Sequence, residues 1–129
     1  MLGIAKVATQ KHIVNPPPSF DNASAAETQG MGLCAGEWRV TATWNTTGGN
    51  DSLYEAQVFL YPGSGGALVT GLTSGDTSWQ EFTGETGSTA ETGTMHSRQY
   101  TIKLVRISDS FVVDEIDTNT VTAETGAAC

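Results

Sequence analysis

Few side chains in this sequence have the type and spacing that enzyme chemistry requires. The two histidines, His12 and His96, stand far apart, and neither lies in a motif with a carboxylate or a cysteine. A general base or an activated nucleophile needs such a neighbour. The glycine-rich stretch Pro62–Gly66 is not followed by the Gly-Lys-Ser/Thr residues of a phosphate-binding loop. The sequence therefore predicts no catalytic residues, and a protein that is not an enzyme.

Acidic residues near the end of the chain are the best candidates for a metal site. They are Asp109, Asp114, Glu115 and Asp117, and Ca²⁺ requires several oxygens that converge at about 2.3–2.6 Å. Their spacing is not that of an EF-hand loop, and in a strand Asp114 and Glu115 point to opposite faces. We expect these acids to be solvated and to protect sheet edges from aggregation. No metal and no other cofactor is predicted.

Aromatic residues allow two interpretations. Trp38, Trp79, Phe59 and Tyr61 could form a platform for sugars if they shared an exposed sheet face. However, the alternation of residues places Trp79 in the core. Phe59 and Tyr61 lie on the other face of their segment, opposite its inward apolar residues, so both faces of the segment are apolar. This pattern predicts a second surface over Phe59 and Tyr61, either another subunit or the N-terminal leader of the chain, and we assign both residues to partner binding.

The two cysteines, Cys34 and Cys129, lack the CxxC spacing of a zinc or redox site. A disulfide between them would close a loop of nearly the whole domain and would stabilise it by roughly 4–5 kcal/mol in the chain-entropy model. The first residues do not resemble a secretion signal, because their apolar patch is short and Lys6 interrupts it. We therefore expect two free thiols.

Charge is distributed unevenly along the chain, whose net charge is −8. All fourteen acids lie beyond Phe20, whereas the first twelve residues contain Lys6, Lys11 and His12 and no acid. The acidic part lacks the clustered Lys and Arg that would neutralise phosphates or anionic lipids. No stretch approaches the roughly 20 apolar residues of a membrane span. The sequence predicts neither a nucleic-acid partner nor a membrane partner.

Residues 1–36 differ from the rest and predict an extended N-terminal arm. Three prolines fix an extended backbone and remove hydrogen-bond donors, and a weak helical tendency follows at Ala23–Gln29. A segment of this length without strong periodicity is expected to lie across a partner rather than fold alone. The partner-binding residues predicted in the arm are Pro16, Pro17, Pro18 and Phe20.

From Glu37 onwards, alternating apolar and polar residues predict strands separated by turn clusters. The expected strands cover residues 37–45, 54–61, 67–72, 77–83, 99–107, 111–116 and 119–125, the last two being either one broken strand or two. No long helix is expected, so one antiparallel sandwich domain over residues 37–129 is predicted. Its predicted core residues are Trp44, Val58, Leu60, Trp79, Tyr100, Ile102 and Leu104.

Four of these segments resemble a fibronectin type III or related immunoglobulin-like domain. "VTATW" at 40–44, "YEAQVFLY" at 54–61, "TSWQEFTG" at 77–84 and "QYTIKLVRI" at 99–107 follow one another as strands B, C, E and F do. Trp44 and Tyr100 match the Trp that ends strand B and the Tyr that opens strand F. The resemblance spans about residues 37–125, and "GTMHSR" replaces the expected turn before strand F. It implies an all-β, antiparallel immunoglobulin-like β-sandwich of about seven strands, with an extended N-terminal arm.

The features together indicate a structural protein of an assembly. We expect a bacteriophage virion protein, a head decoration or cement protein that is made in the host cytoplasm and binds the major capsid protein or other virion proteins. A homo-oligomer is expected, with a trimer as one option. The alternatives are a phage tail or fibre component, and a secreted adhesion or carbohydrate-binding module in the extracellular space. The acidic stretch "TGETGSTAETGT" at 83–94 is expected to be an exposed connector between two strands.

Overall fold

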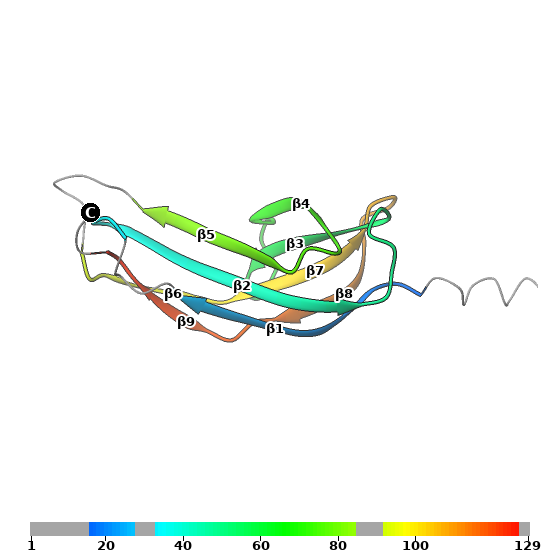
Figure 1. The fold of residues 1–129 in the computed structure, drawn as a ribbon. Coiled ribbons are helices and arrows are strands. Elements are labelled where there is room, and N and C mark those ends of the chain that lie inside the picture. The colour runs from blue at the N-terminus through cyan, green and yellow to red at the C-terminus, as the bar shows by residue number, and fades with distance from the viewer. Residues whose placement is uncertain (1–15, 28–32, 85–91, 127–129) are drawn as a thin grey trace, which may run out of the picture.

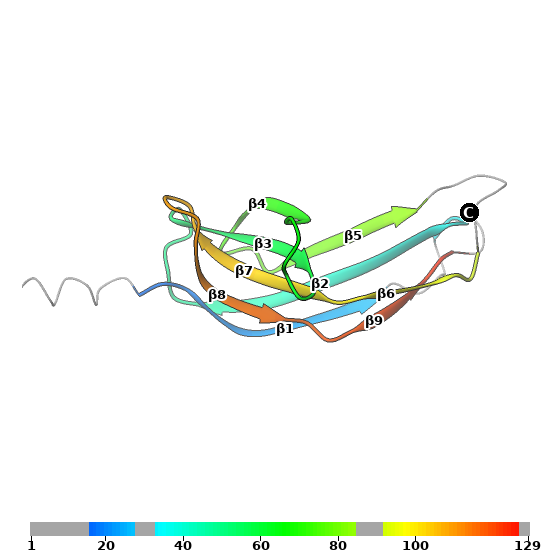
Figure 2. The same cartoon turned by 180° about the vertical axis from the view of Figure 1, so that it is seen from behind.

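The computed structural model describes residues 16–27, 33–84 and 92–126, which form strands and turns without a helix. No helix in these ranges could cross a membrane. The strands are β1 (Ser19–Glu27), β2 (Glu37–Thr47), β3 (Tyr54–Leu60), β4 (Val69–Thr73), β5 (Ser78–Gly84), β6 (Met95–Arg98), β7 (Tyr100–Arg106), β8 (Phe111–Asp117) and β9 (Val121–Glu124). Figures 1 and 2 show an elongated molecule whose strands run along its length.

Two main sheets pack face to face, and a small sheet extends one of them. The first sheet has the order β1-β2-β5, the second has the order β4-β3-β7-β8, and β6 pairs with β9. All strand pairs are antiparallel. This arrangement confirms the predicted all-β antiparallel sandwich.

The described residues contain nine strands rather than about seven, because β1 and β6 form in addition to the seven predicted segments. β6 and β7 are separated only by Gln99, and β9 follows β8 along the same line (Figure 1). The register Arg98↔Val121 becomes Thr101↔Asp117 across the break, so one extra residue lies on the β8–β9 side, as in a β-bulge. Thr118 bridges the gap, since its hydroxyl accepts from the Tyr100 N–H. β6 itself forms within "GTMHSR", where no strand is predicted from the sequence.

The core lies between the two main sheets and follows the period of two in the strands. In β2, every second residue from Trp38 to Trp44 is buried, while Thr43 and Asn45 are exposed. Inward side chains of both sheets therefore meet, which is the usual core of a sandwich. The buried cluster consists of Ala25, Trp38, Val40, Ala42, Trp44, Ala56, Val58, Tyr100, Ile102, Leu104 and Ala123.

The structure buries most of the residues predicted for the core. Trp44, Val58, Tyr100, Ile102 and Leu104 are buried. Trp79 is half-buried and packs against the cluster, with its ring edge-on to Tyr100 at 5.7 Å between ring centroids. Leu60 is the exception, because 44% of it is exposed. It is the last residue of β3, where the chain turns away into Tyr61 and Pro62.

The helical tendency predicted at Ala23–Gln29 is wrong over its described part, because residues 19–27 form β1. This strand pairs with β2 from Ser19↔Thr47 to Glu27↔Val40, with an irregularity near Asp21. Its Ala25 side chain enters the core, so pairing and packing override a weak local propensity. The described sandwich thus begins at Ser19 instead of Glu37, and only residues before β1 remain for the predicted arm.

Candidate interaction surfaces

An exposed apolar patch lies at one end of the sandwich, where the β2–β3 and β7–β8 turns meet (Figure 1). We call it the end patch; it consists of Leu53, Ile107 and Phe111, which are 53%, 52% and 57% exposed. The Ile107 N–H donates to the Leu53 carbonyl at 3.0 Å, which ties the two turns together. A pocket of about 290 Å³ opens beside it, lined by Ser52, Leu53, Tyr54, Arg106, Ile107 and Ser108.

Arg106 and Asp109 hold the β7–β8 side of the end patch in place. The Arg106 guanidinium donates to both Asp109 carboxylate oxygens at 2.9 and 2.7 Å and lies over the Phe111 ring at 5.1 Å from its centroid. The paired Arg106 lowers the pKa of Asp109, mainly through this hydrogen bonding. The charges of Arg106 and Asp109 are therefore matched within the turn, and the apolar side chains of the end patch remain exposed beside them.

The proline segment enters the sandwich at the same end. Pro18 is buried against the β2–β3 turn, where a Cβ on Gly49 would come within 2.6 Å of the Pro18 Cδ. Pro16 and Pro17 are exposed. Phe20, in contrast, packs against the core, and its N–H donates to Asp114 at 2.8 Å. Of the four partner-binding residues predicted here, the structure thus leaves Pro16 and Pro17 on the surface.

Phe59 and Tyr61, the other two predicted partner-binding residues, differ in their exposure. Phe59 is buried, whereas Tyr61 is exposed. The Lys103 Nζ lies 4.5 Å from the centroid of the Phe59 ring and donates to the Gly63 carbonyl at 2.9 Å. The second surface that the sequence predicts over Phe59 is therefore supplied by Lys103 and the β3–β4 turn of the same chain. The sugar platform is also excluded in its four-residue form, since Trp38 is buried.

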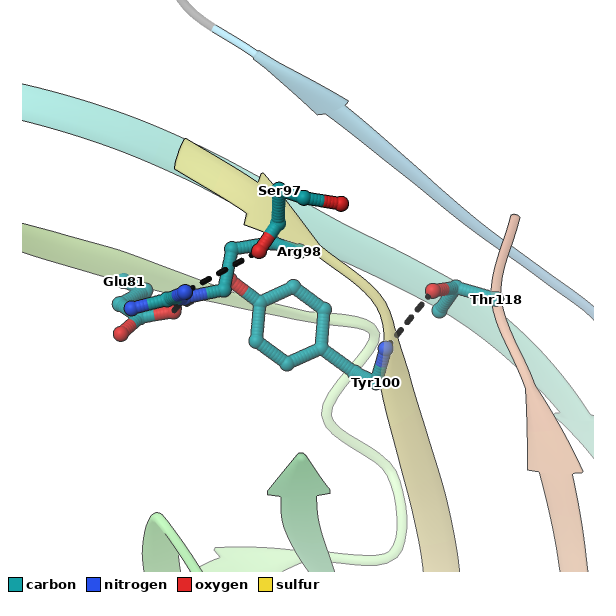
Figure 3. Close-up of polar contacts among 5 residues, drawn as sticks. All are labelled: Glu81, Ser97, Arg98, Tyr100 and Thr118. Carbon is teal, nitrogen blue, oxygen red and sulfur yellow. Dashed lines mark hydrogen bonds and ion pairs between the residues drawn. The ribbon is translucent and has the colours of Figure 1, made fainter. Parts of the chain in front are cut away.

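A polar cluster joins the two sheets at Glu81 (Figure 3). The Tyr100 hydroxyl donates to Glu81 Oε1 at 2.5 Å, and Arg98 Nε donates to the same oxygen at 3.1 Å. Burial of Tyr100, reinforced by Glu81, raises the pKa of this hydroxyl above its usual range. Arg98 also lies over the Trp38 ring, 4.5 Å from its centroid.

His96 belongs to the same neighbourhood and stacks on Trp38, with ring centroids 4.9 Å apart and planes at 16°. The Arg98 guanidinium and the Tyr100 hydroxyl thus both donate to the same Glu81 oxygen, and the His96 ring is packed on an aromatic face. This arrangement links β5 to β6 and β7, and we infer that the cluster stabilises the contact between the sheets.

The acids considered for calcium do not converge. Asp109 binds Arg106, Asp114 accepts from the Phe20 N–H, and Asp117 accepts from the Thr101 hydroxyl at 2.7 Å. No group of three potential metal-ligating side chains occurs among residues 16–27, 33–84 and 92–126. Residues 85–91 of the predicted acidic connector lie outside the described residues, as does His12.

Cys34 corrects the prediction of free thiols, because it is disulfide-bonded. Its surroundings bring the C-terminal strand close: Ala35 forms a parallel bridge with Gly126, and the Gly126 N–H donates to the Glu37 carbonyl at 2.7 Å. Cys129 is the only other cysteine of the sequence and lies outside the described residues. The prediction of free thiols rests on the absence of a secretion signal, and local sequence does not reveal that Gly126 lies beside Ala35.

The end patch was also missed from the sequence. Its three members stand at strand ends or in turns, where the period of two stops and burial can no longer be inferred from alternation. A usable signal was the presence of large apolar residues directly beside the turn clusters "GGNDS" and "SDS".

Comparison with known proteins gives no match: no family model, no curated protein and no solved structure is significantly similar to this chain.

Proposed function

We propose that this chain is a structural, non-enzymatic protein of a bacteriophage virion, namely a head decoration protein with an immunoglobulin-like fold. The strand pairing favours that fold, because β2 and β5 share one sheet and β3 and β7 share the other. These strands are the segments matched to B, E, C and F, and immunoglobulin domains divide them in the same way.

The observation that carries the proposal is the end patch beside the exposed Pro16 and Pro17. Leu53, Ile107 and Phe111 expose apolar surface next to a pocket, and the proline segment reaches the sandwich at the β2–β3 turn. An apolar centre beside an extended segment suits docking on a protein surface by buried area. The major capsid protein is the proposed partner.

The test uses particles of the phage whose genome encodes the chain, stripped of this protein and incubated with purified variants. Ile107→Asp with Leu53→Asp is expected to reduce the bound copies per particle at least tenfold, because charges would be buried without partners. Deletion of residues 1–15 is expected to weaken binding as well. Met95→Asp is the control, since Met95 is also exposed but lies on β6, and it should bind normally.

Undiminished binding of the Leu53/Ile107 variant would reject the end patch as the anchor. Absence of the protein from purified particles would reject the virion assignment altogether. Gold-labelled antibody on intact particles separates the proposed head location from a tail or fibre location.

A secreted adhesion or carbohydrate-binding module is the second candidate, and the disulfide at Cys34 favours it. Disulfides persist in oxidising compartments, although a virion surface is also exposed to them. Binding of the purified protein to a glycan array, abolished by Tyr61→Ala on the exposed aromatic, would support this candidate over the first.

A further inference from the structure

Three of the four edge strands of the main sheets are protected against pairing with another chain. The edge of β1 is capped by Asn119, whose side chain accepts from the Ala25 N–H at 2.8 Å and donates to the Ala25 carbonyl at 3.0 Å. Asp114 of β8 accepts from the Phe20 N–H, so the β1 and β8 edges close on each other. β4 is only five residues long, its register is irregular, and Gly71 has a φ of 86°. Short or irregular edges are poor templates for strand addition.

β5 is the fourth edge strand, and it has none of these protective features: in the described part of the chain, its edge is neither capped by a side chain nor irregular. It pairs with β2 in unbroken register from Glu37↔Gly84 to Thr43↔Ser78, and its sequence contains neither Pro nor Lys. Its one charged residue, Glu81, is paired with Arg98. β5 also ends its sheet, with no strand beyond it among the described residues (Figure 1). This edge is therefore regular and locally neutral in a chain whose net charge is −8.

The register identifies the backbone groups that β5 presents outward. The Trp44 N–H donates to the Thr77 carbonyl at 2.9 Å, which makes these two residues a hydrogen-bonded pair. Such pairs alternate along an antiparallel ladder, so Trp79 and Glu81 also bond to β2. The N–H and C=O groups of Ser78, Gln80 and Phe82 consequently point away from β2, toward the open edge.

We propose that a second copy of this chain pairs at this edge, β5 against β5, in antiparallel orientation about a two-fold axis. The three outward residues are self-complementary when Gln80 faces Gln80 of the partner subunit, because Ser78 then faces the partner's Phe82. Three hydrogen-bonded pairs form, and the two three-stranded sheets become one continuous six-stranded sheet. The second copy is the occupant that this neutral edge suits, since a contact free of unpaired charge avoids repulsion between two acidic molecules.

The outer face beside the edge suits the same arrangement. Arg39 lies over the Phe82 ring, 4.6 Å from its centroid, and Gln80 donates to the Thr41 hydroxyl at 3.2 Å. The side chains of Gln80 and Phe82 are thus held on the outer face of the sheet, and Phe82 is available to cover the partner's Ser78. A two-fold interface closes at two copies, unlike the trimer considered from the sequence. The proposal does not depend on the virion assignment.

Cross-linking tests the register directly. Facing residues of a hydrogen-bonded pair have Cα atoms about 5.5 Å apart, within the range that a disulfide spans. Gln80→Cys is therefore expected to give a covalent dimer under mild oxidation. Ser78→Cys is the matched control: two copies of Ser78 would be four residues out of register, roughly 14 Å apart along the strands, and should not cross-link to each other.

The variant Gln80→Pro tests pairing at the β5 edge without introducing a cysteine. Proline removes an N–H that points outward and leaves the ladder to β2 complete. In sedimentation velocity, the wild type is expected to be a dimer and Gln80→Pro a monomer with the same circular dichroism and a similar Tm. A second variant, Gln80→Lys, places like charges face to face and is expected to give a monomer as well.

The proposal is overturned if the full chain sediments as a monomer or a trimer at about 100 µM. Equal cross-linking of Ser78→Cys and Gln80→Cys, or a dimer that both Gln80→Pro and Gln80→Lys leave intact, would also overturn it.

Discussion

At the scale of single residues, Tyr100 holds a position that serves both the core and the contact between the sheets. Its ring is buried against Trp79, while its hydroxyl reaches Glu81 on β5. A buried phenol normally finds a hydrogen-bond partner, and here the partner is a carboxylate that Arg98 also binds. The Tyr100 side chain therefore packs in the core with its ring and donates a hydrogen bond to a charged carboxylate with its hydroxyl.

Replacing Tyr100 with Phe is expected to lower the free energy of unfolding by about 1.5–3 kcal/mol, the usual contribution of a hydrogen bond to a charged group. The loss arises because the Glu81 carboxylate keeps its burial but loses a donor. Urea unfolding measures it. Tyr61→Phe is the control, since Tyr61 is exposed, and it should leave stability unchanged; an equal loss in both variants would contradict the role of Tyr100.

The same residue predicts a dependence on alkaline pH. The pKa of Tyr100 is raised above its ordinary value of 10.0, mainly by burial and then by Glu81. The neutral hydroxyl is thus favoured in the folded state, and its contribution is complete below about pH 10 and declines as the pH rises above it. Stability of the wild type should fall more steeply above pH 10 than that of Tyr100→Phe. Parallel pH profiles of the two proteins would contradict this linkage.

At the scale of secondary-structure elements, the strands that alternate clearly were predictable and the others were not. β2, β3 and β7 place large apolar residues at every second position, so the sequence reveals their inward faces. β1 is built from small residues such as Ala23, Ser24 and Ala26, which form a strand only because β2 lies beside them. The pairing of β6 with β9 likewise depends on contacts distant in the chain, as does the end patch. Local pattern cannot report such contacts.

The Asn119 side chain supplies the hydrogen-bond partners that the edge of β1 would otherwise lack. It bonds both backbone groups of Ala25 across the β1 edge. Asn119→Ala is expected to cost about 1–3 kcal/mol, since the partly buried N–H and C=O of Ala25 are left without partners. Hydrogen exchange of the Ala25 amide should accelerate more than that of residues in β7. Thr122→Ala on the exposed face of β9 is the control, and unchanged Ala25 exchange in Asn119→Ala would refute the cap.

At the scale of the whole molecule, the sandwich has two different ends. One end carries the proline segment and the end patch. At the other, the first residues of β2 meet the chain near Gly126, where a Cβ would clash with the Leu33 carbonyl oxygen. That approach is possible only for glycine, and it positions the last described residues beside Cys34.

The disulfide at Cys34 is expected to stabilise the whole domain. In the entropic model, closing a loop of about 100 residues contributes roughly 4.7 kcal/mol. Cys34→Ser should therefore unfold at a distinctly lower urea concentration. If Cys129, the only other cysteine, is its partner, Cys129→Ser and the double variant should lose the same amount as Cys34→Ser. Losses that add, or an alkylated thiol in the native unreduced protein, would contradict the bond.

The separation of the two ends has a practical consequence for engineering. β2 runs from the Gly126 contact to the proline segment over eleven residues, which corresponds to about 33 Å of extended strand. A peptide or reporter inserted directly after Gly126, the last described residue, would start at the end of the sandwich remote from the end patch. If the end patch is the surface that binds a larger particle, such a fusion would point away from that particle. The fold would then serve as a scaffold for presenting antigens.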